Sequence, residues 1–212
     1  MARFSPEKER ERLFALSVYE REYASCGPVA GIDEAGRGPL AGPVVAAAVI
    51  LDPEQEIFYI NDSKKLSEHK REELYPEILE KSLAHGIGIV GADEIDEINI
   101  LQATYKAMRL AVRQLALRPG ILLVDAVTIP DLPFRQIPII KGDAKSLSIG
   151  AASILAKVTR DRLMREMDRL YPEYGFAVHK GYGTAAHIEA LRKYGPCPIH
   201  RRSFITHFTK ET

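Results

Sequence analysis

The sequence of 212 residues has no tryptophan, only two cysteines and a formal net charge of zero. Cys26 and Cys197 lie far apart along the chain, which excludes a disulfide framework and a cysteine-rich metal site and favours a reducing compartment. The longest apolar run, residues 44–51, is too short to cross a membrane, and residues 1–21 lack the apolar core of a signal peptide. We therefore expect a soluble, cytoplasmic protein that has no membrane partner.

Positive and negative side chains are balanced, with 29 Lys and Arg against 29 Asp and Glu. The whole-chain charge therefore gives no reason to expect nucleic-acid binding, which would have to depend on local basic clusters. Hydrophobic residues make up 46% of the chain and charged residues 27%, a balance that excludes a largely disordered protein. Since no coiled-coil or repeat pattern is present, we expect a monomer.

The apolar pattern predicts an α/β fold with a mixed sheet flanked by helices. Residues 28–34 and 43–51 are apolar and joined by a Gly/Pro turn, which is typical of an antiparallel hairpin. Further strands are predicted at 56–60, 86–91, 121–124 and 135–141, helices at 5–23, 67–84, 148–170 and 184–194, and one or two helices at 93–117. We expect a peripheral N-terminal helix in residues 1–27, a main domain in 28–170, and a helical and loop subdomain in 171–212 that packs on it.

Acidic residues stand at or just beyond the ends of three of the predicted strands. Asp33 and Glu34 end one apolar strand, Asp125 stands at the end of another, and Asp143 lies just beyond a third. If these strands are neighbours, the carboxylates form a cluster that cannot stay fully ionised in a low-dielectric cleft without cations. Oxygen ligands suit Mg²⁺ or Mn²⁺, and two such ions would support displacement at phosphorus. The alternative is that each acid is a solvated strand-end residue, and for Asp125 alone this is an equally good interpretation.

The segment after Glu34 is a glycine-rich turn. Gly36 and Gly38 flank Arg37, so backbone N–H groups and one fixed positive charge are available to a phosphate. Successive strand residues point to opposite faces, so Asp33 and Glu34 cannot both point inward from regular β structure. We expect the glycine-rich turn to distort the strand end and to re-aim one of the two side chains. The alternative is a tight turn that binds no ligand.

Polar and basic residues precede two predicted helices, where backbone N–H groups can meet phosphate. Ser63 and Lys64 lie before one helix, and Lys145 and Ser146 lie before another. Tyr182 stands between two glycines, so its ring could stack on a sugar and its hydroxyl could donate to a ribose, or it could simply anchor a loop. Lys157 and Arg160 share a predicted helix face, and two like charges on a helix usually form only a solvated surface. Arg201 and Arg202 form a further basic spot.

Seven segments of the chain form an ordered set of motifs. They are GIDEAGRGP at 31–39, DSKKLS at 62–67, VDA at 124–126, KGDAKS at 141–146, AASILAKVTRD at 151–161, KGYGT at 180–184 and HRRSF at 200–204. In this order they resemble the motifs of bacterial type 2 ribonucleases H, the ribonuclease HII family. The resemblance covers about residues 28–205, nearly the whole chain.

The resemblance implies a ribonuclease H-like fold with a C-terminal helical part and an endonuclease that depends on Mg²⁺ or Mn²⁺. Such an enzyme hydrolyses the RNA strand of RNA–DNA hybrids, cuts on the 5′ side of single ribonucleotides in duplex DNA, and leaves 5′-phosphate and 3′-hydroxyl ends. By motif, the metal-binding acids would be Asp33, Glu34, Asp125 and Asp143. The junction between ribose and deoxyribose would be recognised by Gly36, Arg37, Gly38 and Tyr182. Alternatives are a DNA-junction nuclease on a similar fold, a hybrid-binding module without catalysis, and a small-molecule α/β enzyme.

Overall fold

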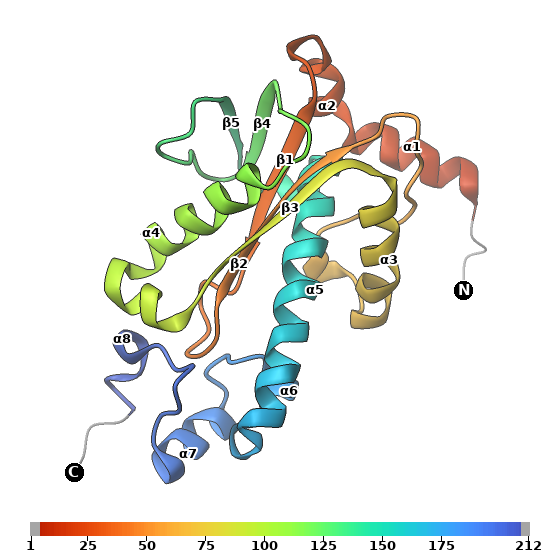
Figure 1. Ribbon diagram of the computed structural model, residues 1–212. Helices are drawn as coiled ribbons and strands as arrows, with labels where there is room; N and C mark the ends of the chain where they lie inside the picture. The colour runs from red at the N-terminus through yellow and green to blue at the C-terminus, as the bar shows by residue number, and fades with distance from the viewer. Residues whose placement is uncertain (1–4, 209–212) are drawn as a thin grey trace.

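A five-stranded mixed sheet forms the centre of the protein (Figure 1). The computed structural model describes residues 5–208. The strands are β1 (Val29–Ala35), β2 (Val44–Leu51), β3 (Ser82–Val90), β4 (Ile121–Asp125) and β5 (Arg135–Ile139), and their order across the sheet is β3-β2-β1-β4-β5. β2 lies antiparallel to β1 and β3, whereas β4 lies parallel to β1 and β5. The predicted α/β class, the mixed sheet and the first hairpin are therefore confirmed.

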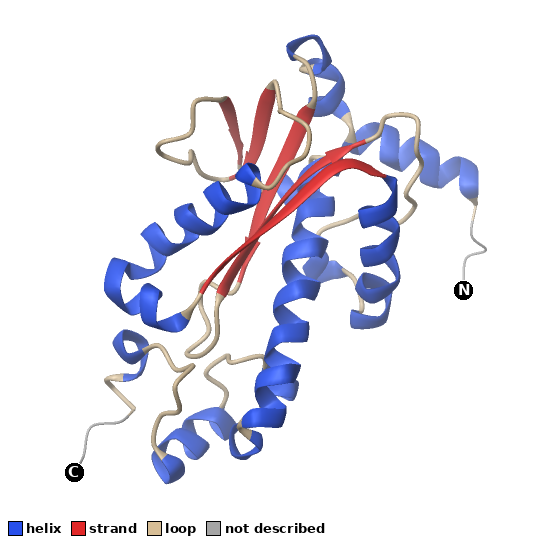
Figure 2. Ribbon diagram, in the orientation of Figure 1, coloured by secondary structure: helices blue, strands red, loops and turns tan. Residues whose placement is uncertain are grey.

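Helices cover both faces of this sheet (Figure 2). They are α1 (Pro6–Leu16), α2 (Val18–Glu22), α3 (Glu68–Lys81), α4 (Ala92–Arg113), α5 (Leu147–Leu170), α6 (Phe176–His179), α7 (Ala185–Tyr194) and α8 (Arg202–Ile205). α4 packs on the face that carries Ile32 and Val124, whereas α3 and α5 pack on the opposite face, against Val45 and Val49. Within residues 5–208, no helix combines the length and the apolarity needed to cross a bilayer.

The segment after α5 packs against the turn that joins β1 to β2. A buried cluster connects this turn, α5, α6 and α7 through Ala41, Met164, Phe176 and Ala190. Ala41 also forms an isolated β-bridge with His200. The C-terminal elements therefore lie next to the end of β1, where the first two acids stand. The division of the chain into a main domain and a C-terminal subdomain stays a prediction.

Several element boundaries differ from the expectation. No strand forms at 56–60, because Ile57 and Ile60 pack from a loop into the core beside α3 and α5. β3 begins earlier than predicted, since α3 ends before residue 82. The predicted N-terminal helix divides into α1 and α2. α4 is interrupted at Asn99, whose backbone is left-handed with φ 67° and whose side chain caps the helical turn that follows.

The absence of a side chain at Gly31 allows α5 to approach β1 closely. A Cβ built on Gly31 would overlap backbone atoms of Ser148 and Ile149. We expect Gly31→Ala to push α5 away from β1 and to lower the free energy of unfolding by about 1–3 kcal/mol. Urea unfolding measures this loss. Gly91→Ala is the control, because no atom lies within 4 Å of a Cβ at Gly91, and an equal loss there would contradict the packing argument.

Candidate active site

The predicted acids gather where β1, β4 and β5 reach the same edge of the sheet. The parallel register of β1 and β4 runs up to the residues that precede Asp33 and Asp125, so these two side chains leave the sheet as neighbours. Asp143 lies in the short 3-10 turn Gly142–Ala144, after β5. The Oδ1 atom of Asp125 accepts a hydrogen bond of 2.7 Å from the backbone N of Gly142. This bond ties the turn that carries Asp143 to the end of β4.

Asp33 and Glu34 lie on opposite faces of the sheet. β1 keeps regular pairing with β2 through Ala35, so the expectation of a distorted strand end is wrong. Asp33 faces α5 and accepts a hydrogen bond from Ser153, whereas Glu34 emerges on the face covered by α4. Both carboxyls still interact electrostatically with Asp125, because all three stand at the edge where the strands end.

Burial and mutual repulsion raise the pKa of three of these carboxyls. Burial is the main cause of the raised pKa of Asp33, and the charges of Glu34 and Asp125 raise it further. Burial is again the main cause of the raised pKa of Glu34 and of Asp143, and Asp125 contributes to both. The cluster therefore holds more carboxyl groups than it can keep ionised without compensating positive charge.

Two basic side chains offset part of this negative charge. Lys64 Nζ lies 3.3 Å from Asp143 Oδ2, and the Lys64 side chain is 76% exposed. Arg37 Nη1 lies 3.6 Å from Glu34 Oε1, while Lys145 is exposed beside α2. Within residues 5–208, no three His, Cys, Asp or Glu side chains already enclose a point that could hold a metal ion. A divalent cation at this edge would compete with Lys64 for Asp143, and Lys64 is exposed enough to turn aside.

The hydroxyls of Ser63 and Ser146 are buried and already hydrogen-bonded. Ser63 Oγ lies 2.8 Å from the Oγ of Ser153, the residue that donates to the first acid of the site. Ser146 Oγ caps α5 by accepting a hydrogen bond of 3.2 Å from the backbone N of Ile149, and it donates to Glu20 at 2.6 Å. Both hydroxyls are thus turned away from solvent and stabilise the segments that carry the acids.

The glycine-rich turn and Tyr182 lie side by side although they are far apart in sequence. A Cβ built on Gly38 would lie 3.9 Å from Cε1 of Tyr182, which is 45% exposed. Gly36 has a left-handed backbone with φ 95°, which glycine adopts without steric cost. The Arg37 side chain is 46% exposed beside Glu34. The structure therefore brings the residues that were predicted to read the junction onto one surface next to the acids.

Two arginines that were expected on a basic surface are buried beneath this turn. Arg160 is 1% exposed and Arg201 is 0% exposed, so their interpretation as surface charges is wrong. Lys157 is also engaged, in an ion pair of 2.7 Å with Asp161. Both arginines donate to backbone carbonyl oxygens at 2.5–3.1 Å. The acceptors of Arg160 are Pro43, Lys180 and Ala41. The acceptors of Arg201 are Gly42, Arg37 and Gly36. No pattern in the sequence indicates this role, because the charge of an arginine does not reveal its burial.

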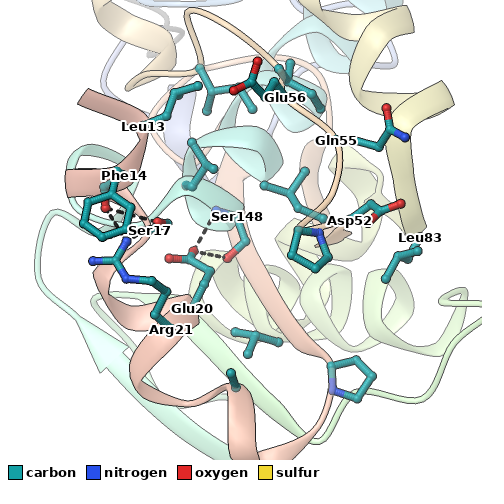
Figure 3. Close-up of a pocket in the computed structure, with 18 of the residues that line it drawn as sticks. Leu13, Phe14, Ser17, Glu20, Arg21, Asp52, Gln55, Glu56, Leu83 and Ser148 are labelled. Carbon is teal, nitrogen blue, oxygen red and sulfur yellow. Dashed lines mark hydrogen bonds between the residues drawn. The ribbon is translucent and has the colours of Figure 1, made fainter. Parts of the chain in front are cut away.

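A cavity of about 880 Å³ lies between the N-terminal helices and the sheet, and its lining includes none of the four acids (Figure 3). The lining is mainly apolar and includes Leu13, Phe14 and Leu83. Glu20 Oε1 accepts hydrogen bonds from the backbone N and the hydroxyl of Ser148, at 2.9 and 2.7 Å, at the positive N-terminal end of α5. An apolar cavity does not suit a phosphodiester, so we infer that Glu20 docks α2 onto α5 and takes no part in catalysis.

Comparisons with known proteins agree with this arrangement. The family model described as ribonuclease HII matches residues 30–207. Ribonuclease HII of Lachnoclostridium phytofermentans is 61% identical over 201 residues, which cover 95% of this chain and 79% of that protein. Ribonuclease HII of Caldanaerobacter subterraneus subsp. tengcongensis is 58% identical over 206 residues, which cover 96% and 86% of the two chains. The crystal structure of ribonuclease H2 from Pyrococcus horikoshii OT3 has a TM-score of 0.70 and 30% identity, over 86% of this chain and 99% of that one.

The family match covers nearly all of the structure from β1 through α8. It includes the four acids, the glycine-rich turn and Tyr182. The fold expected from the resemblance, a mixed sheet flanked by helices, is shared with the solved relative. The chain therefore belongs to the ribonuclease HII family and is a metal-dependent type 2 ribonuclease H.

Proposed function

We propose that the enzyme hydrolyses the RNA strand of RNA–DNA hybrids as an endonuclease. We propose further that it cuts duplex DNA on the 5′ side of a single embedded ribonucleotide and leaves 5′-phosphate and 3′-hydroxyl ends. The observation that supports this most is the position of Tyr182 and the Gly36–Gly38 turn beside the four carboxyls. A single 2′-hydroxyl separates a ribonucleotide from its deoxy neighbours, so its recognition needs the close backbone approach that glycine permits.

We infer that divalent cations, Mg²⁺ or Mn²⁺, are held by Asp33, Glu34, Asp125 and Asp143. Carboxylate oxygens are the ligands that these ions prefer. The raised pKa of Asp33, Glu34 and Asp143 indicates a shortage of positive charge that such cations would relieve. Two bound ions would supply activation of water and stabilisation of the charge that develops on the phosphate oxygens. No protein nucleophile is needed in this scheme.

The exposed basic and aromatic side chains around the acids would hold the substrate. Lys64 and Lys145 would contact phosphates as point charges, and Arg37 would contact a phosphate through its planar guanidinium. The backbone N–H groups of the Gly36–Gly38 turn would lie against the sugar–phosphate chain. Tyr182 would stack its exposed ring on the sugar and donate its hydroxyl to the ribose. The two buried serines would act indirectly, because they fix the segments that carry the acids.

Cleavage of a labelled DNA duplex that contains one ribonucleotide tests this function, with Mg²⁺, with Mn²⁺ and with a chelator. We expect metal-dependent incision on the 5′ side of the ribonucleotide and no cleavage of an all-DNA duplex of the same sequence. If a long hybrid were cut and the single-ribonucleotide duplex were not, the proposal that the four acids bind metal would stand. The proposal that Tyr182 and the Gly36–Gly38 turn recognise a single ribonucleotide would fail. Cleavage of branched DNA would instead favour a DNA-junction nuclease.

A further inference from the structure

Two buried histidines lie behind Tyr182. His187 is 0% exposed and His200 is 1% exposed, and both rings pack against Phe176. Nδ1 of His187 lies 2.9 Å from the carbonyl oxygen of Tyr182, and Nε2 of His187 lies 3.0 Å from Nε2 of His200. At the other end, the backbone N of Cys197 lies 3.0 Å from Nδ1 of His200. These groups form one continuous hydrogen-bonded chain from Cys197 to Tyr182.

The two ends of this chain decide where its protons lie. The carbonyl of Tyr182 can only accept, so Nδ1 of His187 carries a hydrogen. Nδ1 of His200 lies 3.0 Å from the backbone N of Cys197 and 3.3 Å from its carbonyl oxygen. Because one of the two facing Nε2 atoms must donate to the other and that of His187 is bare, we infer that Nδ1 of His200 carries no hydrogen and accepts from the N–H of Cys197. A neutral His200 then has its hydrogen on Nε2 and donates it to the bare Nε2 of His187. Burial lowers the pKa of His187, and lowers that of His200 to about 4, so both rings are neutral at pH 7.

This histidine pair connects Tyr182 to the Gly36–Gly38 turn, the two parts of the surface that we propose to face the substrate. On one side, His187 holds the main chain of Tyr182 at its carbonyl oxygen. On the other side, His200 directly precedes Arg201, whose guanidinium donates to carbonyl oxygens of the Gly36–Gly38 turn. A shift of either imidazole would therefore change the distance between the tyrosine ring and the turn.

We propose that His187 and His200 are positioning residues, which fix the main chain of Tyr182, and with it the ring, against the Gly36–Gly38 turn. The proposal rests on the proposed role of Tyr182 in reading the ribonucleotide. An imidazole suits this task because it is rigid and has a donor at one end and an acceptor at the other. Two imidazoles span the distance between Cys197 and Tyr182 and give the Tyr182 carbonyl and all four ring nitrogens a hydrogen-bond partner. A buried polar atom without a partner would lower the stability of the fold.

Two substitutions of His187 separate its two hydrogen bonds. Asn places its amide near the position of Nδ1 and keeps a donor for Tyr182, whereas Gln reaches the position of Nε2 and loses that donor. We expect His187→Gln to lower kcat/KM on the single-ribonucleotide duplex, relative to a long hybrid, by about tenfold, and His187→Asn to lower this ratio less than about threefold. His69→Gln is the control, because the His69 side chain is 86% exposed. Equal ratios for His187→Gln and His187→Asn would overturn the proposal.

The ¹⁵N chemical shifts of the imidazoles in the wild-type enzyme at pH 7 give a readout that does not depend on activity. We expect the hydrogen of His187 on Nδ1 and that of His200 on Nε2. The reverse pattern, or a doubly protonated ring, would overturn the proposal, and these spectra decide even if His187→Gln fails to fold. If the shifts are as expected but the wild type does not cut the single-ribonucleotide duplex, the positioning of Tyr182 stands and its proposed function fails.

Discussion

Replacing Asp33 with Asn is expected to lower the single-turnover rate of cleavage of an RNA–DNA hybrid by at least about a thousandfold, which corresponds to about 4 kcal/mol of lost transition-state stabilisation. Asp33 is 4% exposed and stands beside Glu34 and Asp125 at the edge of the sheet. Asn preserves the size of the side chain and one acceptor oxygen, but it removes the negative charge that a divalent cation requires. Single-turnover cleavage at saturating Mg²⁺ or Mn²⁺ measures the effect.

The same substitution is expected to leave the metal-free enzyme as stable as the wild type or more stable. Burial and the neighbouring carboxyls raise the pKa of Asp33 above its ordinary value of 3.8. Because the pKa of Asp33 is higher in the folded state than in the unfolded state, the folded state binds more protons at pH values between these two pKa values. The free energy of unfolding of the wild type therefore falls as the pH rises through this interval, and it stays lower above it. Asn carries no charge and avoids this loss. Thermal melting in the presence of a chelator measures it, and added Mn²⁺ should raise the melting temperature of the wild type more than that of the variant.

Asp131→Asn is the matched control for this prediction. Asp131 is exposed and has a left-handed backbone with φ 60°, a conformation that asparagine adopts readily. We expect neither turnover nor melting temperature to change in this variant. Wild-type turnover in Asp33→Asn would show that Asp33 is not a metal ligand. A loss of turnover that came with a large fall in melting temperature would point to a structural role instead.

The strands and the position of the acids could be predicted because both depend on local sequence. Asp33 and Asp125 each follow an apolar stretch, so the strands and their ends could be recognised together. The opposite orientation of Asp33 and Glu34 followed from the alternation of a regular strand, and the expected distortion was unnecessary because the strand end lets both carboxyls reach Asp125. Residues 56–60 misled the prediction, since Ile57 and Ile60 are buried by packing from a loop.

The anchoring of the glycine-rich turn could not be predicted, because it depends on contacts between distant segments. Arg160 comes from α5 and Arg201 from the loop before α8, and both donate to backbone carbonyl oxygens in or near the turn. A backbone carbonyl is present at every residue, so no pattern of side chains marks it as a partner. The two arginines could be recognised as buried only when the path of the β1–β2 turn was known.

Arg201→Met is expected to lower the free energy of unfolding by about 3 kcal/mol, because three carbonyl oxygens, two of them in buried hydrogen bonds, lose their donors at about 1–3 kcal/mol each. These oxygens belong to Gly36, Arg37 and Gly42. Burial of the charge also has a cost, since it lowers the pKa of Arg201 to about 9, although the side chain stays protonated at pH 7. Methionine removes that cost but leaves the carbonyls without partners, so we expect the loss of hydrogen bonds to dominate.

Arg201→Lys should fall between the wild type and Arg201→Met, because an ammonium can reach one of the carbonyls but lacks the planar fork that serves all three. Arg202→Met is the control, since Arg202 is the next residue in the chain and is exposed. Urea unfolding of the three variants gives the free energies. Cleavage of the single-ribonucleotide duplex should fall in the same order, because Gly36 and Arg37 face the proposed junction. If Arg201→Met unfolded like the wild type, the carbonyls of the turn would have found other donors, and the C-terminal segment would not be what holds the turn in place.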